Sequence, residues 1–150
     1  MAARNAFVFA LVLLTLAPSL PAGAVTVTDL RGIHLDSLFG RYAPRGDCAR
    51  EPRITVDPTG IAFTNGGRTV HTGKFEYAVS YGPYDYQGIS SWFFPFVKNA
   101  DDFGPVLMTF NADEKPGLLT ITNQATGAAS PLHAALFRNS PYRKCASMRR

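Results

Sequence analysis

Polar and apolar residues alternate along several short stretches of this chain, which is the pattern of half-buried β-strands. In residues 74–81, for example, Phe75, Tyr77 and Val79 fall on one face of an extended backbone. The other stretches of this kind are RITVD at 53–57, GIAFT at 60–64, RTVHT at 68–72, PVLMTFN at 105–111 and LLTITN at 118–123. We therefore expect a protein built mainly from short β-strands.

Turn sequences separate these stretches. Residues 57–60 read DPTG, with proline at the second position of a four-residue turn. Residues 64–67 read TNGG, and Asn-Gly accepts the positive φ angles of a hairpin turn. In DEKPG at 113–117, Pro116 and Gly117 are placed for type II geometry. Turns this tight favour strands that run antiparallel to the next strand in the sequence.

Two short helices are expected beside the strands. Asp29 can cap a helix over residues 29–39, where apolar residues fall near helical spacing. Ser130 can cap a second helix that has Pro131 at its first position and ends near Asn139. Seven or eight strands in an antiparallel meander then form a small barrel or a strongly curved sheet, with one or two short helices. A two-sheet β-sandwich is the alternative.

The N-terminal residues have the order of a secretory signal peptide. Arg4 precedes the apolar run Phe7–Leu16, and small residues follow at 22–24. This run is shorter than the roughly 17–25 residues that span a bilayer. We expect residues 1–24 to be removed and residues 25–150 to form a single β-rich domain. That domain contains no second long apolar run, so we expect a periplasmic or secreted protein with no membrane span in its mature form.

Two cysteines, Cys48 and Cys145, follow the expected cleavage site. In an oxidising compartment a disulfide between them is the expected state. It would close a loop of about 100 residues and stabilise the fold by at most about 4–5 kcal/mol. The alternative is that Cys48 is a free, nucleophilic thiol.

The charge is mildly basic. Beyond residue 24, 14 Lys and Arg stand against 11 Asp and Glu, an excess too small to indicate nucleic-acid binding. A disulfide would join the basic residues around the two cysteines into one patch suited to an anionic protein or cell-wall polymer. These residues are Arg41, Arg45, Arg50 and Arg53 near Cys48, and Arg138, Arg143, Lys144, Arg149 and Arg150 near Cys145.

Residues 81–96, YGPYDYQGISSWFFPF, hold the only Trp and an unusual density of rings. If the end of this stretch is a strand, Trp92 and Phe93 point to opposite faces. Most of the phenylalanines then belong to the core. Tyr84, Tyr86 and either Trp92 or Phe93 are candidates for a protein-binding surface, because interfaces favour large amphipathic rings. We place Arg45 and Arg50 at its rim.

The sequence contains few patterns that indicate catalysis or a cofactor. His34, His71 and His133 are far apart and have no second ligand at metal-binding spacing, so neither a metal nor another cofactor is expected. Residues 99–104, NADDFG, leave a weak calcium site open. Two of four carboxylates could in principle meet as the pair that glycoside hydrolysis needs, and no catalytic residue is assigned. They are Asp47, Glu51, Glu76 and Asp85.

The export signal, the size, the β-rich meander and the single disulfide resemble small periplasmic inhibitor and immunity proteins of Gram-negative bacteria, such as the lysozyme inhibitors. The Ser-Gly-x-x-Tyr motif of the membrane-bound and C-type lysozyme inhibitors is absent, since QGISSW at 87–92 does not match it, so no functional residue is carried over. GRYAP, GDC, EPRITVD and DDFGPVLMTFNADEKPG also look like segments of a family of small exported bacterial proteins. The resemblance implies a protein that binds another protein or a wall component without turning over a substrate.

Three functions are therefore open. The first is a non-catalytic binder, such as an inhibitor or immunity protein, that neutralises a protein partner in the cell envelope through an aromatic loop and a basic patch. The second is a small-ligand carrier that uses a barrel pocket. The third is an enzyme that acts on cell-wall glycan.

Overall fold

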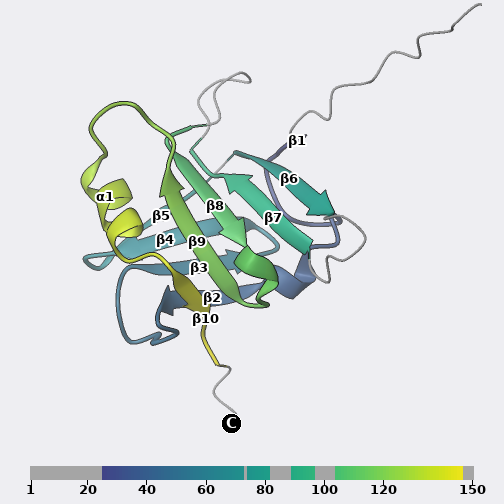
Figure 1. Ribbon diagram of the computed structural model, residues 1–150, viewed down its shortest axis with the longest axis horizontal. Helices are drawn as coiled ribbons and strands as arrows, with labels where there is room; N and C mark the ends of the chain where they lie inside the picture. Colours follow the sequence, from purple (N-terminus) through teal and green to yellow (C-terminus); the bar gives the residue numbers. More distant parts are fainter. Residues whose placement is uncertain (1–24, 73, 82–88, 97–103, 147–150) are drawn as a thin grey trace, which may run out of the picture.

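The computed structural model of the protein describes residues 25–72, 74–81, 89–96 and 104–146 (Figure 1). Within these residues the fold is mainly β, with one α-helix, α1 (Pro131–Arg138), and two short 3₁₀ turns, η1 (Asp36–Leu38) and η2 (Ala112–Glu114). The strands are β1 Val25–Val27, β2 Gly40–Pro44, β3 Arg53–Asp57, β4 Gly60–Asn65, β5 Arg68–His71, β6 Phe75–Tyr81, β7 Ile89–Phe94, β8 Val106–Phe110, β9 Leu118–Asn123 and β10 Tyr142–Lys144.

All ten strands form one antiparallel sheet in the order β1-β6-β7-β8-β9-β10-β2-β3-β4-β5. From β2 to β10 each strand pairs with the next strand in sequence, except that β5 does not pair with β6. A further pairing, between β10 and β2, joins the two runs of strands into one sheet. Residues 72–74 nevertheless join β5 to β6, so the two ends of the sheet must curl toward each other. The result is a half-barrel, in which β7, β8 and β9 cross in front of β2, β3 and β4 (Figure 1). The predicted curved meander is confirmed, and the two-sheet alternative is wrong.

Aromatic side chains fill the inside of the half-barrel. The rings of Phe93 and Phe110 meet edge to face with centroids 5.3 Å apart, and Tyr42 meets Phe110 in the same way at 5.4 Å. Such pairs add to the free energy gained by burial. The largest fully buried side chains are Tyr42, Tyr142, Phe63, Phe75, Phe93, Phe110, Leu30, Leu38, Ile54, Ile61, Met108 and Leu119. These side chains form a packed core inside the described part of the half-barrel.

Two buried tyrosines tie the helical segments to this core. The Tyr42 hydroxyl donates to the Leu38 carbonyl at 2.8 Å, and the Tyr142 hydroxyl donates to the Leu136 carbonyl at 3.0 Å. Burial disfavours the phenolate, so it raises the pKa of Tyr42 to about 12 and raises that of Tyr142 further. Both hydroxyls thus remain donors throughout the physiological range and hold η1 and α1 against the sheet.

The predicted hairpins form where the turn sequences indicate them. Residues 57–60 join β3 to β4, and Thr59 donates its backbone N–H to the Asp57 carboxylate at 2.7 Å. Residues 65–68 join β4 to β5, and both Gly66 and Gly67 have positive φ. Hydrogen bonds from Thr59 are stronger to the charged form of the Asp57 carboxyl group than to the neutral form, so they lower its pKa.

One of the two predicted helices forms as expected. Ser130 caps α1, because its hydroxyl accepts the His133 backbone N–H at 3.2 Å, and Pro131 begins the helix. The prediction of a helix over residues 29–39 is wrong, because only the short 3₁₀ turn η1 forms there. Gly32 and His34 have φ angles of 74° and 55°, and the Asp29 carboxylate accepts the Arg31 N–H in a local turn. Left-handed residues of this kind interrupt an α-helix.

Two strands were not expected from the sequence. β1 pairs with β6, and β10 joins the C-terminal half of the meander to β2. Among the described residues, no helix has both the length and the apolar character that a membrane crossing requires. The proposed signal peptide, residues 1–24, lies outside the described residues.

Candidate functional site

The aromatic strand β7 separates the two rings that the sequence left as alternatives. Phe93 is fully buried and lies in register with Tyr77 of β6 and Met108 of β8, so its assignment to a protein-binding surface is wrong. Phe93 faces inward because its strand neighbours Tyr77 and Met108 pack on the same core. Trp92 points to the other face and is 38% exposed. Tyr84 and Tyr86 lie outside the described residues.

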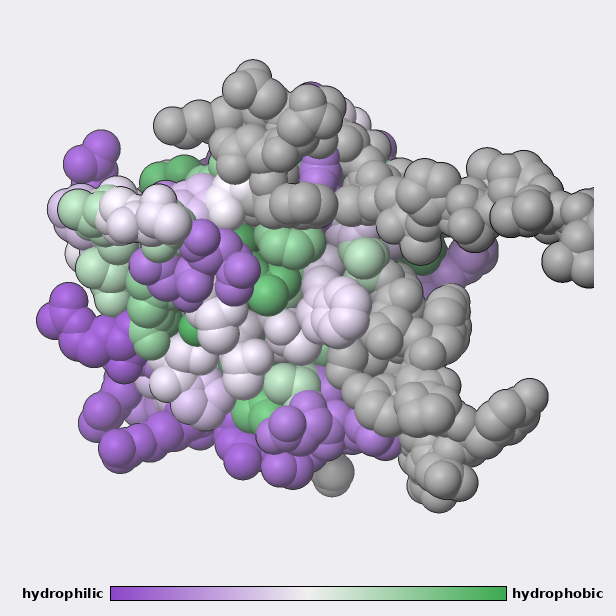
Figure 2. Space-filling model, turned by 45° about the horizontal axis from the view of Figure 1, so that its top comes forward, coloured by the Kyte–Doolittle hydropathy of each residue, from purple (hydrophilic) through white to green (hydrophobic). Residues whose placement is uncertain are grey.

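Large apolar side chains reach the surface at two places within the described residues. Val70 of β5 is 42% exposed and Trp92 of β7 is 38% exposed. Figure 2 shows one face of the molecule, with hydrophilic side chains along its left and lower margins and apolar residues exposed between them. Single exposed apolar residues are ordinary on protein surfaces, so a binding site needs further evidence.

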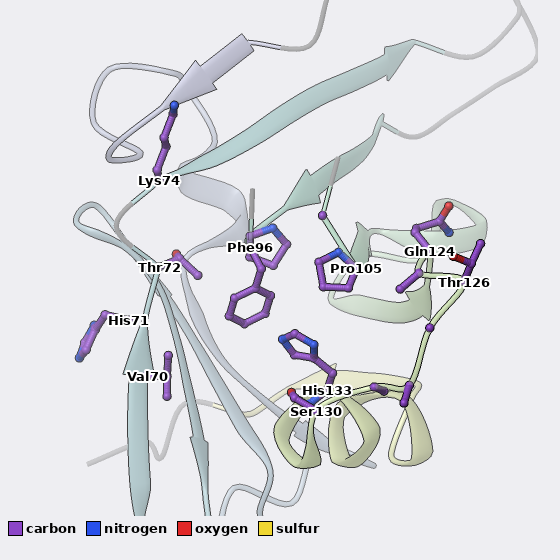
Figure 3. Close-up of a pocket in the computed structure, with 16 residues that line it drawn as sticks. Val70, His71, Thr72, Lys74, Phe96, Pro105, Gln124, Thr126, Ser130 and His133 are labelled. Atoms are coloured by element: carbon purple, nitrogen blue, oxygen red, sulfur yellow. The ribbon is translucent and has the colours of Figure 1, made fainter. Parts of the chain in front are cut away.

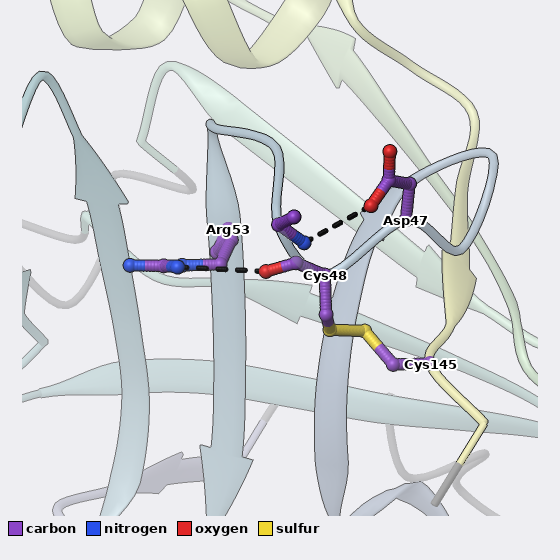
Figure 4. The surroundings of a disulfide bond; sticks show 5 residues. Asp47, Cys48, Arg53 and Cys145 are labelled. Atoms are coloured by element: carbon purple, nitrogen blue, oxygen red, sulfur yellow. Dashed lines mark hydrogen bonds between the residues drawn. A yellow bond between two sulfur atoms is a disulfide. The ribbon is translucent and has the colours of Figure 1, made fainter. Parts of the chain in front are cut away.

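The predicted disulfide is confirmed: Cys48 and Cys145 are bonded, with their Cα atoms 5.9 Å apart (Figure 4). Local hydrogen bonds order the loop that carries Cys48. Asp47 accepts the Ala49 N–H at 3.1 Å, and Arg53 donates to the Cys48 carbonyl at 3.4 Å (Figure 4). The free-thiol alternative for Cys48 is therefore wrong in this structure.

The basic residues near the disulfide divide into two groups. Arg50 pairs with Asp47 at 3.1 Å and Arg53 pairs with Glu51 at 3.3 Å, so neighbouring acids offset these charges. Arg45 instead lies with Arg138 and Arg143 around a pocket of about 340 Å³. The disulfide thus brings the two basic segments together, as the sequence predicts.

Trp92 and the arginine-lined pocket occupy different parts of the sheet. Trp92 lies on β7 and Arg45 follows β2, and β8, β9 and β10 separate these two strands. Four strand spacings correspond to about 19 Å along the sheet. The aromatic and basic residues therefore form two separate surfaces, and a role of either surface in partner binding stays a prediction.

A cleft of about 830 Å³ lies at the opening between β5 and β6. The end of β5, the residues that flank β7 and β8, the loop from β9 to α1, and α1 itself line it. Figure 3 shows Phe96 and His133 pointing toward each other in its middle. Other lining residues include Val70, Thr72, Lys74, Pro105, Gln124 and Ser130.

Contacts with the core fix the floor of this cleft. The Phe96 ring lies 5.2 Å from Phe63 and 4.6 Å from His133, measured between centroids. Thr72 is buried and gives both its backbone N–H, at 2.9 Å, and its hydroxyl, at 3.0 Å, to the Ile61 carbonyl. The floor is thus pre-formed by packing rather than assembled from exposed loop residues.

The polar groups of the cleft are mostly uncharged. Burial disfavours the imidazolium and lowers the pKa of His133, so this ring is neutral at pH 7. Ser130 uses its hydroxyl oxygen to cap α1, while Lys74 is exposed and forms no ion pair with any described residue. The cleft offers an aromatic floor, a neutral imidazole and one cation at its edge.

The carboxylates considered for glycan hydrolysis do not meet among the described residues. Glu76 is buried on β6, whereas Asp47 and Glu51 follow β2. In the sheet, β7, β8, β9 and β10 lie between β6 and β2. Glu51 also accepts the Gly67 N–H at 3.1 Å. Asp85 and most of the calcium candidate at 99–104 lie outside the described residues. No group of three His, Cys, Asp or Glu side chains in the described segments is placed to hold a metal.

Comparison with protein-family models, with curated proteins and with solved structures finds no significant match. The site must therefore be interpreted from its own residues. Residues 124–130, QATGAAS, line this cleft, and none of the sequence-based expectations places a site there. The run of small side chains there was the available signal, because small residues leave room beside a core.

Proposed function

We propose that this chain is an exported binding protein that holds a ligand in the cleft between β5 and α1 without transforming it. The main observation behind this proposal is the cleft itself, because its volume of about 830 Å³ falls within the range of about 300–1,000 Å³ that is typical of small-molecule sites. The packed interior of the half-barrel favours this external site over a chamber inside the barrel.

The cleft walls indicate the chemistry of the ligand. Phe96, Pro95 and Pro105 offer an apolar surface, whereas Gln124 and the neutral imidazole of His133 offer hydrogen bonds. Lys74 places a positive charge at the edge. A ligand with an aromatic or aliphatic body and a polar or anionic end matches this arrangement.

Two observations support export. The order of charge, apolar run and small residues before Val25 is that of a signal peptide. The disulfide is the state expected of an exported rather than a cytosolic protein. A periplasmic or secreted location is consistent with both.

Filling the cleft tests the proposal. Gly127 lines the cleft, and a Cβ there would meet no heavy atom within 4 Å, so Gly127→Trp adds a large side chain at the cleft wall with open space for its first atom. The probe is anilinonaphthalene sulfonate, which combines rings with an anionic group, and its fluorescence is titrated with the oxidised protein. We expect Gly127→Trp to weaken probe binding at least tenfold, about 1.4 kcal/mol, with the melting temperature unchanged.

Ala49→Trp is the matched control, because it adds the same side chain on the exposed loop after β2. It should leave probe binding unchanged. Absence of probe binding by the parent chain, or equal binding by parent and Gly127→Trp, would contradict the ligand cleft.

The exposure of Trp92 supports a second candidate, a protein that neutralises a partner in the cell envelope. A few Trp, Tyr and Arg side chains carry most of the energy of protein interfaces. Pull-down from a periplasmic extract, with the parent chain and Trp92→Ala side by side, tests this function. A partner retained equally by both would exclude Trp92 from the interface.

A further inference from the structure

A second pocket, of about 340 Å³, lies between the turn after β2, the end of α1 and β10. Its lining is dominated by three arginines on three separate segments of the chain. The lining residues are Pro44, Arg45, Arg138, Asn139, Ser140, Pro141 and Arg143. No acidic side chain is among them.

The three guanidinium groups have no acidic partner within the described residues. The ion pairs found there are Arg31–Asp29, Arg50–Asp47, Arg53–Glu51 and Lys115–Asp113. All three arginines are exposed, so solvent screens much of their mutual repulsion, and a bound anion would offset the rest. The disulfide nevertheless links the segments that carry Arg45 and Arg143, three and two residues from Cys48 and Cys145.

Arg45 also adopts a backbone conformation that favours glycine. The turn 43–46 is closed by a 3.0 Å hydrogen bond between its first carbonyl and its last N–H, and it has Pro44 second and Arg45 third, with φ 59°. The turn 115–118 closes in the same way, at 3.0 Å, but has Gly117 third, with φ 77°. An arginine where the matching turn uses glycine is a local cost that points to a function of its side chain.

Two polar residues of the lining, Asn139 and Ser140, already make hydrogen bonds within the fold. Asn139 caps α1 by giving its backbone N–H and its side-chain amide to the Ala135 carbonyl, at 3.3 and 2.8 Å. The charge of Arg138 is therefore not needed to bond that helix end. The Ser140 hydroxyl oxygen accepts the Ile121 N–H at 2.9 Å, so its own hydrogen remains to be donated.

We propose that this pocket binds a phosphate group carried by a small phosphomonoester. Guanidinium groups match the oxygens of phosphate with paired, charge-assisted hydrogen bonds, and three of them from three segments can together offer more donors than a single carboxylate accepts. The volume exceeds that of a bare phosphate, and Pro44 and Pro141 provide apolar walls for the attached group. This site is separate from the cleft and does not depend on the function proposed for it.

Isothermal titration of the oxidised full chain at low ionic strength tests the site, with inorganic phosphate and glucose 6-phosphate as separate probes. We expect glucose 6-phosphate to bind more tightly than inorganic phosphate, and sulfate to compete with both. Arg45→Gly, Arg138→Gln and Arg143→Gln should each weaken binding at least tenfold. Arg45→Gly should keep or raise the melting temperature, because glycine adopts positive φ without strain.

Arg68→Gln is the matched control, since it removes one exposed arginine from β5 at the far end of the sheet. Equal weakening by this control would show general charge attraction and overturn the site. Acetate binding as tightly as phosphate would overturn the chemical class. A sharp fall in melting temperature in both Arg45→Gly and Arg45→Asn would show that Arg45 is structural and overturn its assignment as a ligand.

Discussion

The half-barrel is joined by strand pairing at one place, between β10 and β2, and is open at another, between β5 and β6. At the β10–β2 seam, strands about 100 residues apart in sequence pair in register, and the Cys145 N–H donates to the Arg41 carbonyl at 2.8 Å beside the disulfide. At the β5–β6 opening, strands joined by residues 72–74 do not pair at all, and the larger cleft lies there. Strands that follow each other in sequence usually pair, so the missing pairing between β5 and β6 marks the place where the fold leaves room for the cleft.

Removing the disulfide should have the largest effect, because it breaks the closed seam. Replacing both Cys48 and Cys145 with alanine frees a loop spanning 97 residues. The chain-entropy model then gives a loss of about 4–5 kcal/mol in the free energy of unfolding. Urea denaturation measures this loss, with the reduced parent chain as the control. Titratable thiols in the folded, non-reduced parent would contradict the bond itself.

The two adjacent rings of β7, beside the open side of the half-barrel, test which face of this strand belongs to the core. Phe93→Ala should lower the free energy of unfolding by about 3–5 kcal/mol, because it empties a buried site. Trp92→Ala should cost about 1 kcal/mol or less, since the indole is partly in water. Thermal and urea unfolding of the two variants give the comparison. Equal losses would mean that Trp92 is also part of the core.

These expectations show how far the sequence alone determines the structure. Turn residues such as Pro58, Asn65 and Gly117 act locally, so the hairpins could be predicted. The alternation in β7 predicts that Trp92 and Phe93 face opposite ways. It does not reveal which face is inside, because that depends on β6 and β8.

The elements that the sequence did not reveal depend on distant partners. β10 has three residues, Tyr142–Lys144, too few to show a periodic pattern, and its partner β2 lies about 100 residues earlier. The helix expected at 29–39 had the right spacing, but the positive φ angles of Gly32 and His34 override it. The arginine pocket was foreseen only as a basic patch, since its shape depends on where α1 ends.

A smaller effect should appear at the open side as a dependence on pH. Burial lowers the pKa of His133 below its ordinary value of 6.5, so the native state binds fewer protons than the unfolded chain just below that value. The stabilising contribution is complete above pH 6.5 and is lost as the pH falls through the lowered pKa. His133→Gln should therefore flatten the fall in stability that begins as the pH drops below about 6.5. An NMR titration of His133 with a midpoint above 6.5 would reverse this expectation.

The smallest effect is expected for Arg50 on the closed side. Its ion pair with Asp47 is exposed, with side-chain exposures of 67% and 50%. Exposed pairs contribute little, so Arg50→Ala should change the free energy of unfolding by less than about 0.5 kcal/mol. Urea denaturation at low and high salt measures this change. A larger loss would show that the loop after β2 depends on this pair.

The pairing of β10 with β2 also sets the order of events in time. Because Tyr142 is the register partner of Pro44, the seam cannot close until almost the whole described chain is free to fold. Hairpins such as β3–β4 and β8–β9 need only nearby residues and can form early. Contacts between distant residues slow folding. Until the seam closes, β2 has an unpaired edge, and a chaperone or another nascent chain has its best opportunity to reach the protein.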